Sequence, residues 1–204
     1  MPVLTELTID EKAICYELLL YYYRGDLLNR TFEEWQKIIN LLKKHKSMAH
    51  HVQIREAVSL LENIEKEDLE QFEYHFNRLF IGPGKLQAPP YESSYRNFEK
   101  MTMQQETMKV RNFYYFGGLQ VAEEGKVPDD HIKYELEFIL YLLASDNPEH
   151  HSLYKMFLER HFLVWCSQHC EDILNHSPNR IARAFAFLLQ GLAQLEKRMI
   201  EGGE

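Results

Sequence analysis

Apolar residues recur at intervals of three and four residues along most of the chain, and no segment alternates at the two-residue period of a half-buried strand. Side chains with the longer spacing fall on one face of an α-helix. We therefore predict an all-α fold: a single-domain helical bundle of about eight or more helices that spans residues 1–204. The clearest stripes are Leu69, Phe72, Phe76, Leu79 and Phe80; Ile132, Leu136, Ile139, Leu140 and Leu143; and Ile181, Phe185, Leu188, Leu192 and Leu195.

Capping residues give the expected starts and ends of several helices. Thr8 or Asp10 precedes the first apolar stripe, and Gly25 follows it, as expected for the two ends of a helix. Thr31 and Glu34 have the spacing of a capping box, in which each side chain bonds a backbone N–H of the first turn. These positions predict helices that begin near residues 9 and 32.

Two further helix boundaries are expected in the second half of the chain. Asp129 or Asp130 is placed to cap a helix that begins near Ile132. Gly117 and Gly118 interrupt a stripe that continues to residue 119, and glycine in a helix interior costs about 1 kcal/mol relative to alanine. We expect this pair to mark a close contact between helices.

A segment rich in proline and glycine divides the chain at residues 82–95. Gly82 and Pro83 end the helix before it, because proline lacks an N–H and clashes with the preceding turn. Pro89 and Pro90 restrict the residues before them to extended backbone. We predict a stiff loop that presents Tyr91 at its end, either for recognition or as a plug for the core.

Composition limits the classes of partner. The net charge is −8 and the pI about 5.7, whereas a nucleic-acid-binding protein would show a basic face. No apolar run reaches the ~18 residues of a membrane span. The first twelve residues lack the basic start of a signal peptide, so a cytoplasmic location is expected. Three cysteines, Cys15, Cys166 and Cys170, argue against a disulfide scaffold.

One group of residues suggests a metal or haem site. His161, Cys166, His169 and Cys170 are types that bind zinc, but all lie within ten residues of one predicted helix, whereas structural zinc sites usually draw ligands from separate elements. A small helical metal- or haem-binding protein is therefore the alternative prediction. The chain has neither the Gly-x-Ser-x-Gly motif of a nucleophile elbow nor a phosphate-binding loop, so no enzyme activity is predicted.

Three motifs together resemble the TorD/DmsD family of chaperones for exported molybdenum-containing oxidoreductases. The first comprises Glu67, Phe76, Leu79-Phe80 and Pro90-Tyr91-Glu92-Ser93 at characteristic spacing. The second is Pro128-Asp129-Asp130-His131-Ile132 followed by Glu135-Leu136-Glu137-Phe138, and a weaker third is His161-Phe162-Leu163-Val164-Trp165. The resemblance covers the chain from about Leu18 to the C-terminus and implies an all-helical fold.

The resemblance implies a pocket for a twin-arginine signal peptide. Its residues would be Leu79, Phe80, Pro90, Tyr91, Glu92, Asp130 and His131. Tyr91 stands where some relatives have tryptophan, which changes the size of the pocket but keeps it aromatic. The residue types suit such a ligand: guanidinium groups pair with carboxylates and stack on aromatic rings, and an apolar peptide needs an apolar groove. Glu92 is equally suited to a structural role.

The function implied is a cytoplasmic chaperone and not an enzyme. It would bind the signal peptide of a molybdopterin-dependent oxidoreductase subunit, with the mature part of that subunit as a further partner, and delay export until the cofactor is inserted and the subunit has folded. No cofactor of the chaperone itself is predicted: the residues give no sign of bound guanine nucleotide or molybdenum cofactor. The identity of the client and the choice between a monomer and a helix-swapped dimer stay open.

Overall fold

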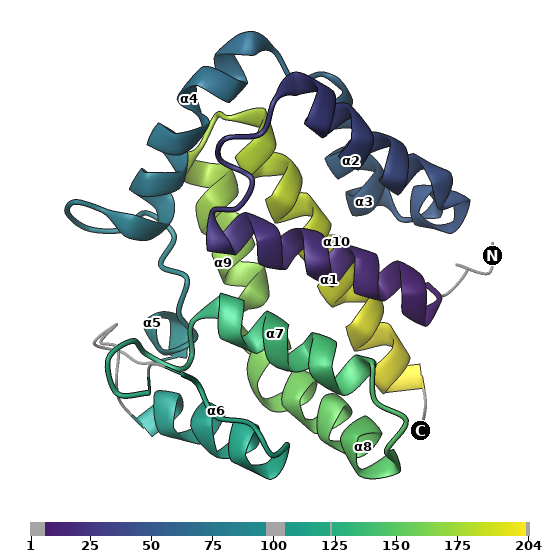
Figure 1. Ribbon diagram of the computed structural model, residues 1–204, viewed down its shortest axis with the longest axis vertical. Coiled ribbons are helices and arrows are strands. Elements are labelled where there is room, and N and C mark those ends of the chain that lie inside the picture. The colour runs from purple at the N-terminus through teal and green to yellow at the C-terminus, as the bar shows by residue number, and fades with distance from the viewer. Residues whose placement is uncertain (1–6, 97–104, 123, 203–204) are drawn as a thin grey trace.

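A computed structural model describes residues 7–96, 105–122 and 124–202, and within these ranges the fold is all-α, as predicted. Figure 1 shows the order of the helices from the N-terminus to the C-terminus. Their bounds are α1 Ile9–Arg24, α2 Phe32–Lys44, η1 Lys46–His50, α3 Val52–Glu62, α4 Lys66–Phe76, η2 Asn77–Ile81, α5 Ser93–Arg96, α6 Gln105–Phe116, α7 Ile132–Leu143, α8 Pro148–Phe157, η3 Leu158–Phe162, α9 Leu163–His176 and α10 Arg180–Gly202.

The caps expected at the first helices are present. Thr8 begins α1 and Thr31 begins α2, and each forms a complete capping box with the glutamate three residues later. Gly25 ends α1 with a φ of 79°, a left-handed conformation that side-chain-bearing residues rarely adopt. These ends depend on contacts within one turn, which explains why the sequence predicts them.

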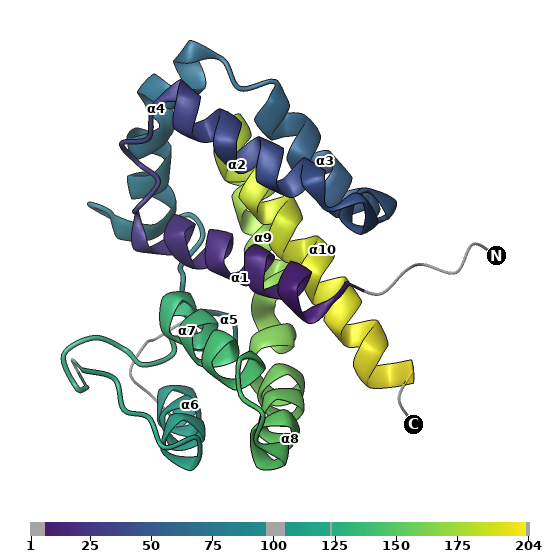
Figure 2. The same ribbon diagram turned by 45° about the vertical axis from the view of Figure 1, so that its right-hand side comes forward.

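The long helix α10 runs through the middle of the bundle, and α3, α9 and α1 pack against it. Helix α7 packs on α1 and α8, while α2 covers α3 on the opposite side (Figures 1 and 2). Tyr22 of α1 lies at the centre of the aromatic core: its ring stacks on Phe185 of α10 at 4.3 Å and contacts Phe72, Phe76 and Phe80. The predicted apolar stripes therefore face a common interior.

A buried ion pair joins α1 to α10. The Nζ atom of Lys12 lies 3.0 Å from a carboxylate oxygen of Glu196, whose side chain is inaccessible to solvent. The hydroxyls of Tyr154 and Tyr16 donate to the other oxygen of Glu196, at 2.8 and 3.3 Å. A buried carboxylate needs such partners, because burial removes its hydration.

Two helices in the middle of the chain differ from the prediction. The loop that begins at Gly82 ends at Glu92 rather than at residue 95, because Ser93–Arg96 form the short helix α5. Helix α6 ends at Phe116, so Gly117 and Gly118 follow it instead of lying inside it. A Cβ atom on Gly117 would lie 2.6 Å from Cε2 of Phe138, so the expected close contact exists there, whereas Gly118 forms a turn with φ of 76°.

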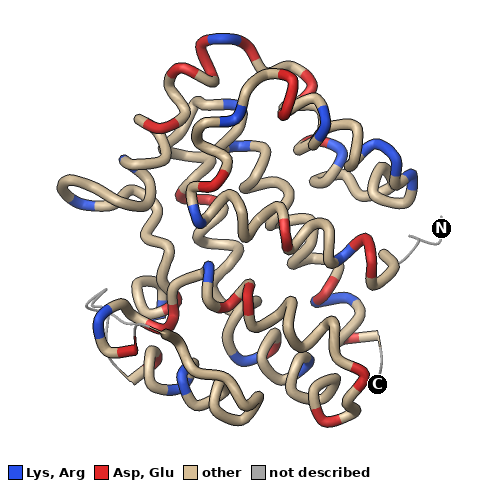
Figure 3. The backbone as a smooth tube through the Cα atoms, in the orientation of Figure 1, with Lys and Arg blue, Asp and Glu red and all other residues tan. Residues whose placement is uncertain are grey.

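The surface is mixed in charge. Acidic residues are spread over the whole molecule rather than confined to one helix (Figure 3). Among the described residues, no helix is both long enough and apolar enough to span a membrane.

Candidate functional site

The end of the central loop and the start of α7 form one unit, although about 40 residues separate them. The backbone N–H of Glu92 donates to the carbonyl of Asp130 at 3.1 Å, and the N–H of Ile132 donates to the carbonyl of Pro90 at 2.9 Å. Between these bonds, Tyr91 and His131 form an isolated antiparallel bridge. The first and second sequence motifs are thus joined through their backbones.

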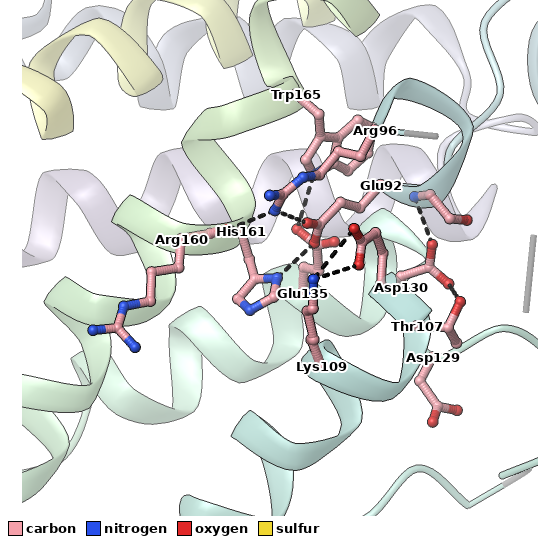
Figure 4. Close-up of polar contacts among 12 residues, drawn as sticks. Glu92, Arg96, Thr107, Lys109, Asp129, Asp130, Glu135, Arg160, His161 and Trp165 are labelled. Atoms are coloured by element: carbon pink, nitrogen blue, oxygen red, sulfur yellow. Dashed lines mark hydrogen bonds and ion pairs between the residues drawn. The ribbon is translucent and has the colours of Figure 1, made fainter. Parts of the chain in front are cut away.

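The Asp130 carboxylate fixes this unit in place. It is fully buried and accepts hydrogen bonds from the backbone N–H of Ser93 at 2.8 Å and from the hydroxyl of Thr107 at 2.7 Å (Figure 4). Asp130 was expected as a helix cap, but its side chain holds α5 and α6 instead. The neighbouring Asp129 pairs with the Arg111 guanidinium, and its carbonyl accepts from the Tyr114 hydroxyl at 2.9 Å.

His131 is the residue that caps α7. Its Nδ1 atom accepts a hydrogen bond from the backbone N–H of Lys133 at 3.1 Å, in place of the aspartate cap expected from the sequence. Burial, together with the positive charge of Lys133, lowers the pKa of His131 to about 3. The imidazole is therefore neutral near pH 7, which the cap requires, because only an unprotonated nitrogen accepts.

Aromatic rings form the partly exposed side of the unit. The Tyr91 and His131 rings lie 5.0 Å apart at an interplanar angle of 85°, an edge-to-face contact. The ring of Tyr134, on the first turn of α7, lies 6.2 Å from the His131 ring. Tyr91 is half-buried, whereas His131 is 8% exposed, so Tyr91 offers the larger accessible surface.

Glu92 lies beneath this unit and is fully buried. One carboxylate oxygen accepts from Nη1 of Arg96 at 2.6 Å, and the other lies 2.8 Å from Nδ1 of His161 in η3 (Figure 4). Arg96 also donates to the carbonyl of Arg160 at 2.8 Å. Glu92 thereby links α5 to η3, the contact that connects the third motif to the first.

Glu135 is the most unusual carboxyl group of the site. It is fully buried, Nε1 of Trp165 donates to its Oε2 at 3.3 Å, and its Oε1 has no hydrogen-bond partner among the described residues. Burial, followed by the charges of Glu92 and Asp130, raises the pKa of Glu135 well above its usual range. Folding therefore extends the pH range over which Glu135 keeps its proton.

Leu79 and Phe80 belong to the π-helical segment η2, which continues α4. Both are buried, and the Phe80 ring packs on Tyr22, Tyr23, Phe76 and His169. The carbonyl of Leu79 accepts from the N–H of Ala88 at 3.1 Å, so η2 supports the loop that carries Tyr91. A second π-helical segment, η3, carries His161, and such segments are frequent at functional sites.

The four residues of the alternative metal site do not share a common centre: the two histidines have separate partners and the two cysteines are buried. His161 pairs with Glu92, and His169 lies between the hydroxyls of Tyr23 at 2.9 Å and Tyr95 at 3.1 Å. Cys166 and Cys170 are buried thiols whose pKa values are raised by burial, which disfavours the thiolate that binds metals. Within the described ranges, no three His, Cys, Asp or Glu side chains are grouped to hold a metal ion.

The structure thus joins five of the seven residues predicted for the site: Pro90, Tyr91, Glu92, Asp130 and His131. Leu79 and Phe80 support the loop from the core. Sequence reasoning missed Thr107 and Arg111, and nothing in their spacing from Asp129 and Asp130 indicates the contacts. Arg96 follows Glu92 by four residues, a spacing that predicts an ion pair on a helix.

Comparisons with known proteins agree with the motifs. The model of the nitrate reductase delta subunit family matches residues 40–171. A protein of Haemophilus influenzae named "Probable Tat proofreading chaperone DmsD" is 30% identical over 156 residues, which cover 76% of this chain and 68% of that protein. The Tat proofreading chaperone DmsD of Salmonella typhimurium is 27% identical over 126 residues, 61% of this chain and 60% of the relative.

A solved structure shares the fold. The crystal structure of a protein from Archaeoglobus fulgidus that is classed as a redox enzyme maturation protein superposes with a TM-score of 0.54 at 20% identity. The superposition covers 93% of this chain and 99% of the other.

Proposed function

This chain belongs to the nitrate reductase delta subunit family and, within it, to the TorD/DmsD group of chaperones, and we propose that it binds the twin-arginine signal peptide of a molybdopterin-dependent oxidoreductase subunit. By occupying the signal peptide, the chaperone delays export until cofactor insertion and folding are complete. The process consists of binding and release in the cytoplasm, with no bond made or broken.

The observation that carries this proposal is the bridge between Tyr91 and His131. It brings the two family motifs together and leaves the Tyr91 ring partly exposed, in edge contact with the His131 ring. A guanidinium group of the peptide stacks on such a ring, an interaction of about 0.5–1 kcal/mol at an exposed site and about 2 kcal/mol when desolvated. Pro90 keeps the ring in place, because its carbonyl is bonded to α7.

We assign Asp130 and Glu92 to the site as the groups that hold Tyr91 and His131. Both carboxylates are fully buried and already accept hydrogen bonds from protein groups. Their contribution to affinity is therefore the rigidity of the Tyr91 loop, since a preorganised site loses less entropy on binding. Leu79 and Phe80 act in the same way from η2.

Calorimetric titration tests the proposal. A synthetic twin-arginine signal peptide from a molybdoenzyme is compared with a copy in which both arginines are glutamine. We expect the altered peptide to bind at least about tenfold more weakly, which corresponds to about 1.4 kcal/mol. Tyr91→Ala should weaken binding of the natural peptide, whereas Tyr74→Ala, on a 57% exposed tyrosine of α4, is the matched control. Absence of binding to signal peptides from several molybdoenzymes would contradict the proposal.

A further inference from the structure

A cleft of about 380 Å³ lies between α7 and the segment that follows α6. This volume lies within the range of about 300–1,000 Å³ that is usual for ligand sites. Its floor is Phe138, which is 1% exposed, and apolar residues of the segment 119–122 line one side. The lining residues are Tyr114, Leu119, Gln120, Val121, Ala122, Tyr134, Glu137 and Phe138.

The glycine pair after α6 creates this cleft. Gly117 lets the backbone approach Phe138, because any larger residue would place its Cβ 2.6 Å from that ring. Gly118 then adopts a left-handed conformation with φ of 76° that turns the chain. The N–H of Leu119 donates a hydrogen bond to the carbonyl of Tyr114 at 2.8 Å. The segment after the turn therefore lines the cleft opposite α7 instead of extending α6.

The cleft adjoins the candidate site through Tyr134. Tyr134 lines the cleft, and its ring lies 6.2 Å from the His131 ring, which in turn lies 5.0 Å from the Tyr91 ring. A chain of three rings thus leads from the exposed end of the loop into the cleft.

The charge at the edge of the cleft suits a basic ligand. The Oε1 atom of Glu137 lies 3.8 Å from Nη1 of Arg24. Both side chains are exposed to solvent, Glu137 at 43% and Arg24 at 46%. Ion pairs between exposed side chains contribute at most about 1 kcal/mol, so a ligand guanidinium can replace Arg24. An apolar floor with a carboxylate at its edge matches a peptide in which arginines precede an apolar stretch.

We infer that this cleft binds the apolar stretch of the signal peptide, with aliphatic side chains over Phe138 and an arginine at Glu137. The inference rests on the proposed function and names a part of the site beyond the seven residues predicted from the sequence. It assigns discrimination among signal peptides to Leu119, Val121 and Ala122, because residues that line an apolar cleft determine which side chains fit.

The test compares Leu119→Asp with Leu41→Asp, because Leu119 is 36% exposed and Leu41, on α2, is 40% exposed. Each variant is titrated with two peptides that keep both arginines: the natural one and a copy whose apolar stretch is replaced by serine and glycine. We expect Leu119→Asp to weaken binding of the natural peptide at least about tenfold and to leave the polar copy unchanged. Leu41→Asp should bind both peptides as the unmodified protein does.

Three results would overturn the inference. If Leu119→Asp binds the natural peptide normally, the cleft is not the site of the apolar stretch, although the proposed function stands. If sedimentation shows that the unmodified protein self-associates and Leu119→Asp abolishes this, the cleft is an interface between copies of the chain. If the unmodified protein binds neither peptide, the proposed function and the inference both fail.

A second variant tests the same cleft without adding a charge. Ala122→Phe places a ring in the space between the 119–122 segment and α7. It should compete with the peptide's aliphatic side chains and lower affinity for the natural peptide alone. Circular dichroism confirms that each variant keeps its helical content, and Ala122→Phe decides the question if Leu119→Asp does not fold.

Discussion

The side chain of Asp130 accepts a hydrogen bond from the backbone N–H of Ser93 at 2.8 Å, across 37 residues of sequence. Its other carboxylate oxygen accepts from the Thr107 hydroxyl at 2.7 Å. One buried group therefore joins the end of the central loop, helix α6 and the start of α7. These two hydrogen bonds hold the three segments of the site together.

Removal of the Thr107 hydroxyl should destabilise the protein and loosen the site. Thr107→Val deletes one hydrogen bond to the Asp130 carboxylate, a loss of about 1.5–3 kcal/mol for a bond to a charged group. Thr107→Ser keeps the hydroxyl and is the control. Urea unfolding at pH 7 measures the difference in free energy of unfolding. Equal stability of the two variants would show that the bond contributes nothing.

The His131 cap should make stability sensitive to acid. Because the folded-state pKa is about 3, below the usual value of 6.5, the unfolded chain binds the proton first as pH falls. The contribution of His131 is therefore complete above about pH 6.5 and is lost progressively towards about pH 3. His131→Asn keeps a neutral cap and should reduce this loss, whereas His131→Ala should cost about 1 kcal/mol at pH 7.

Urea unfolding at several pH values between 4 and 8 tests this prediction. His169 is also buried, with a pKa lowered to about 3 by burial, so part of the acid sensitivity should persist in His131→Asn. An unchanged pH profile in His131→Asn would assign the sensitivity to other groups.

Glu135 should have the opposite effect on stability, which it lowers as the pH rises. Its folded-state pKa lies well above the usual 4.5, so the folded protein keeps the proton after the unfolded chain has lost it. Stability should therefore fall as pH rises above about 4.5, until the folded-state pKa is passed. Glu135→Gln removes the ionisable group, keeps an acceptor for Trp165, and should flatten this fall.

Unfolding measured from pH 5 to pH 8 tests the role of Glu135. Glu137→Gln is the matched control, because this glutamate is on the same helix and its side chain is 43% exposed. If both variants show the profile of the unmodified protein, Glu135 is not protonated in the folded state.

The buried pair of Lys12 and Glu196 should behave as a unit. Lys12→Met or Glu196→Leu alone leaves one buried charge without its partner, and removal of one member of such a pair costs about 3–5 kcal/mol. The double variant should recover much of this stability, because no unpaired charge remains. Urea unfolding of the four proteins gives the coupling free energy, and additive effects would contradict the prediction.

Local contacts explain which parts of the fold could be predicted. The capping boxes at Thr8 and Thr31, the end of α1 at Gly25 and the break at Gly82 each depend on residues within one or two turns. The apolar stripes predicted the helices for the same reason, since an α-helix places residues three and four apart on one face. The prediction for the start of α7 chose the wrong cap, because the aspartates there have partners in other helices.

The sequence by itself determined the all-α class, the ends of the first two helices at Thr8, Gly25 and Thr31, and the motifs that mark the family. Tertiary structure alone decided that Asp130 holds Ser93 and Thr107, that Glu92 meets His161 from 69 residues away, and that the glycines after α6 open a cleft beside Tyr134. The physical reason is the distance along the sequence over which each contact acts. Helix caps and apolar periodicity depend on residues within one or two turns of each other. The partner of a buried carboxylate is set by which helices pack together, and only the whole chain determines that packing.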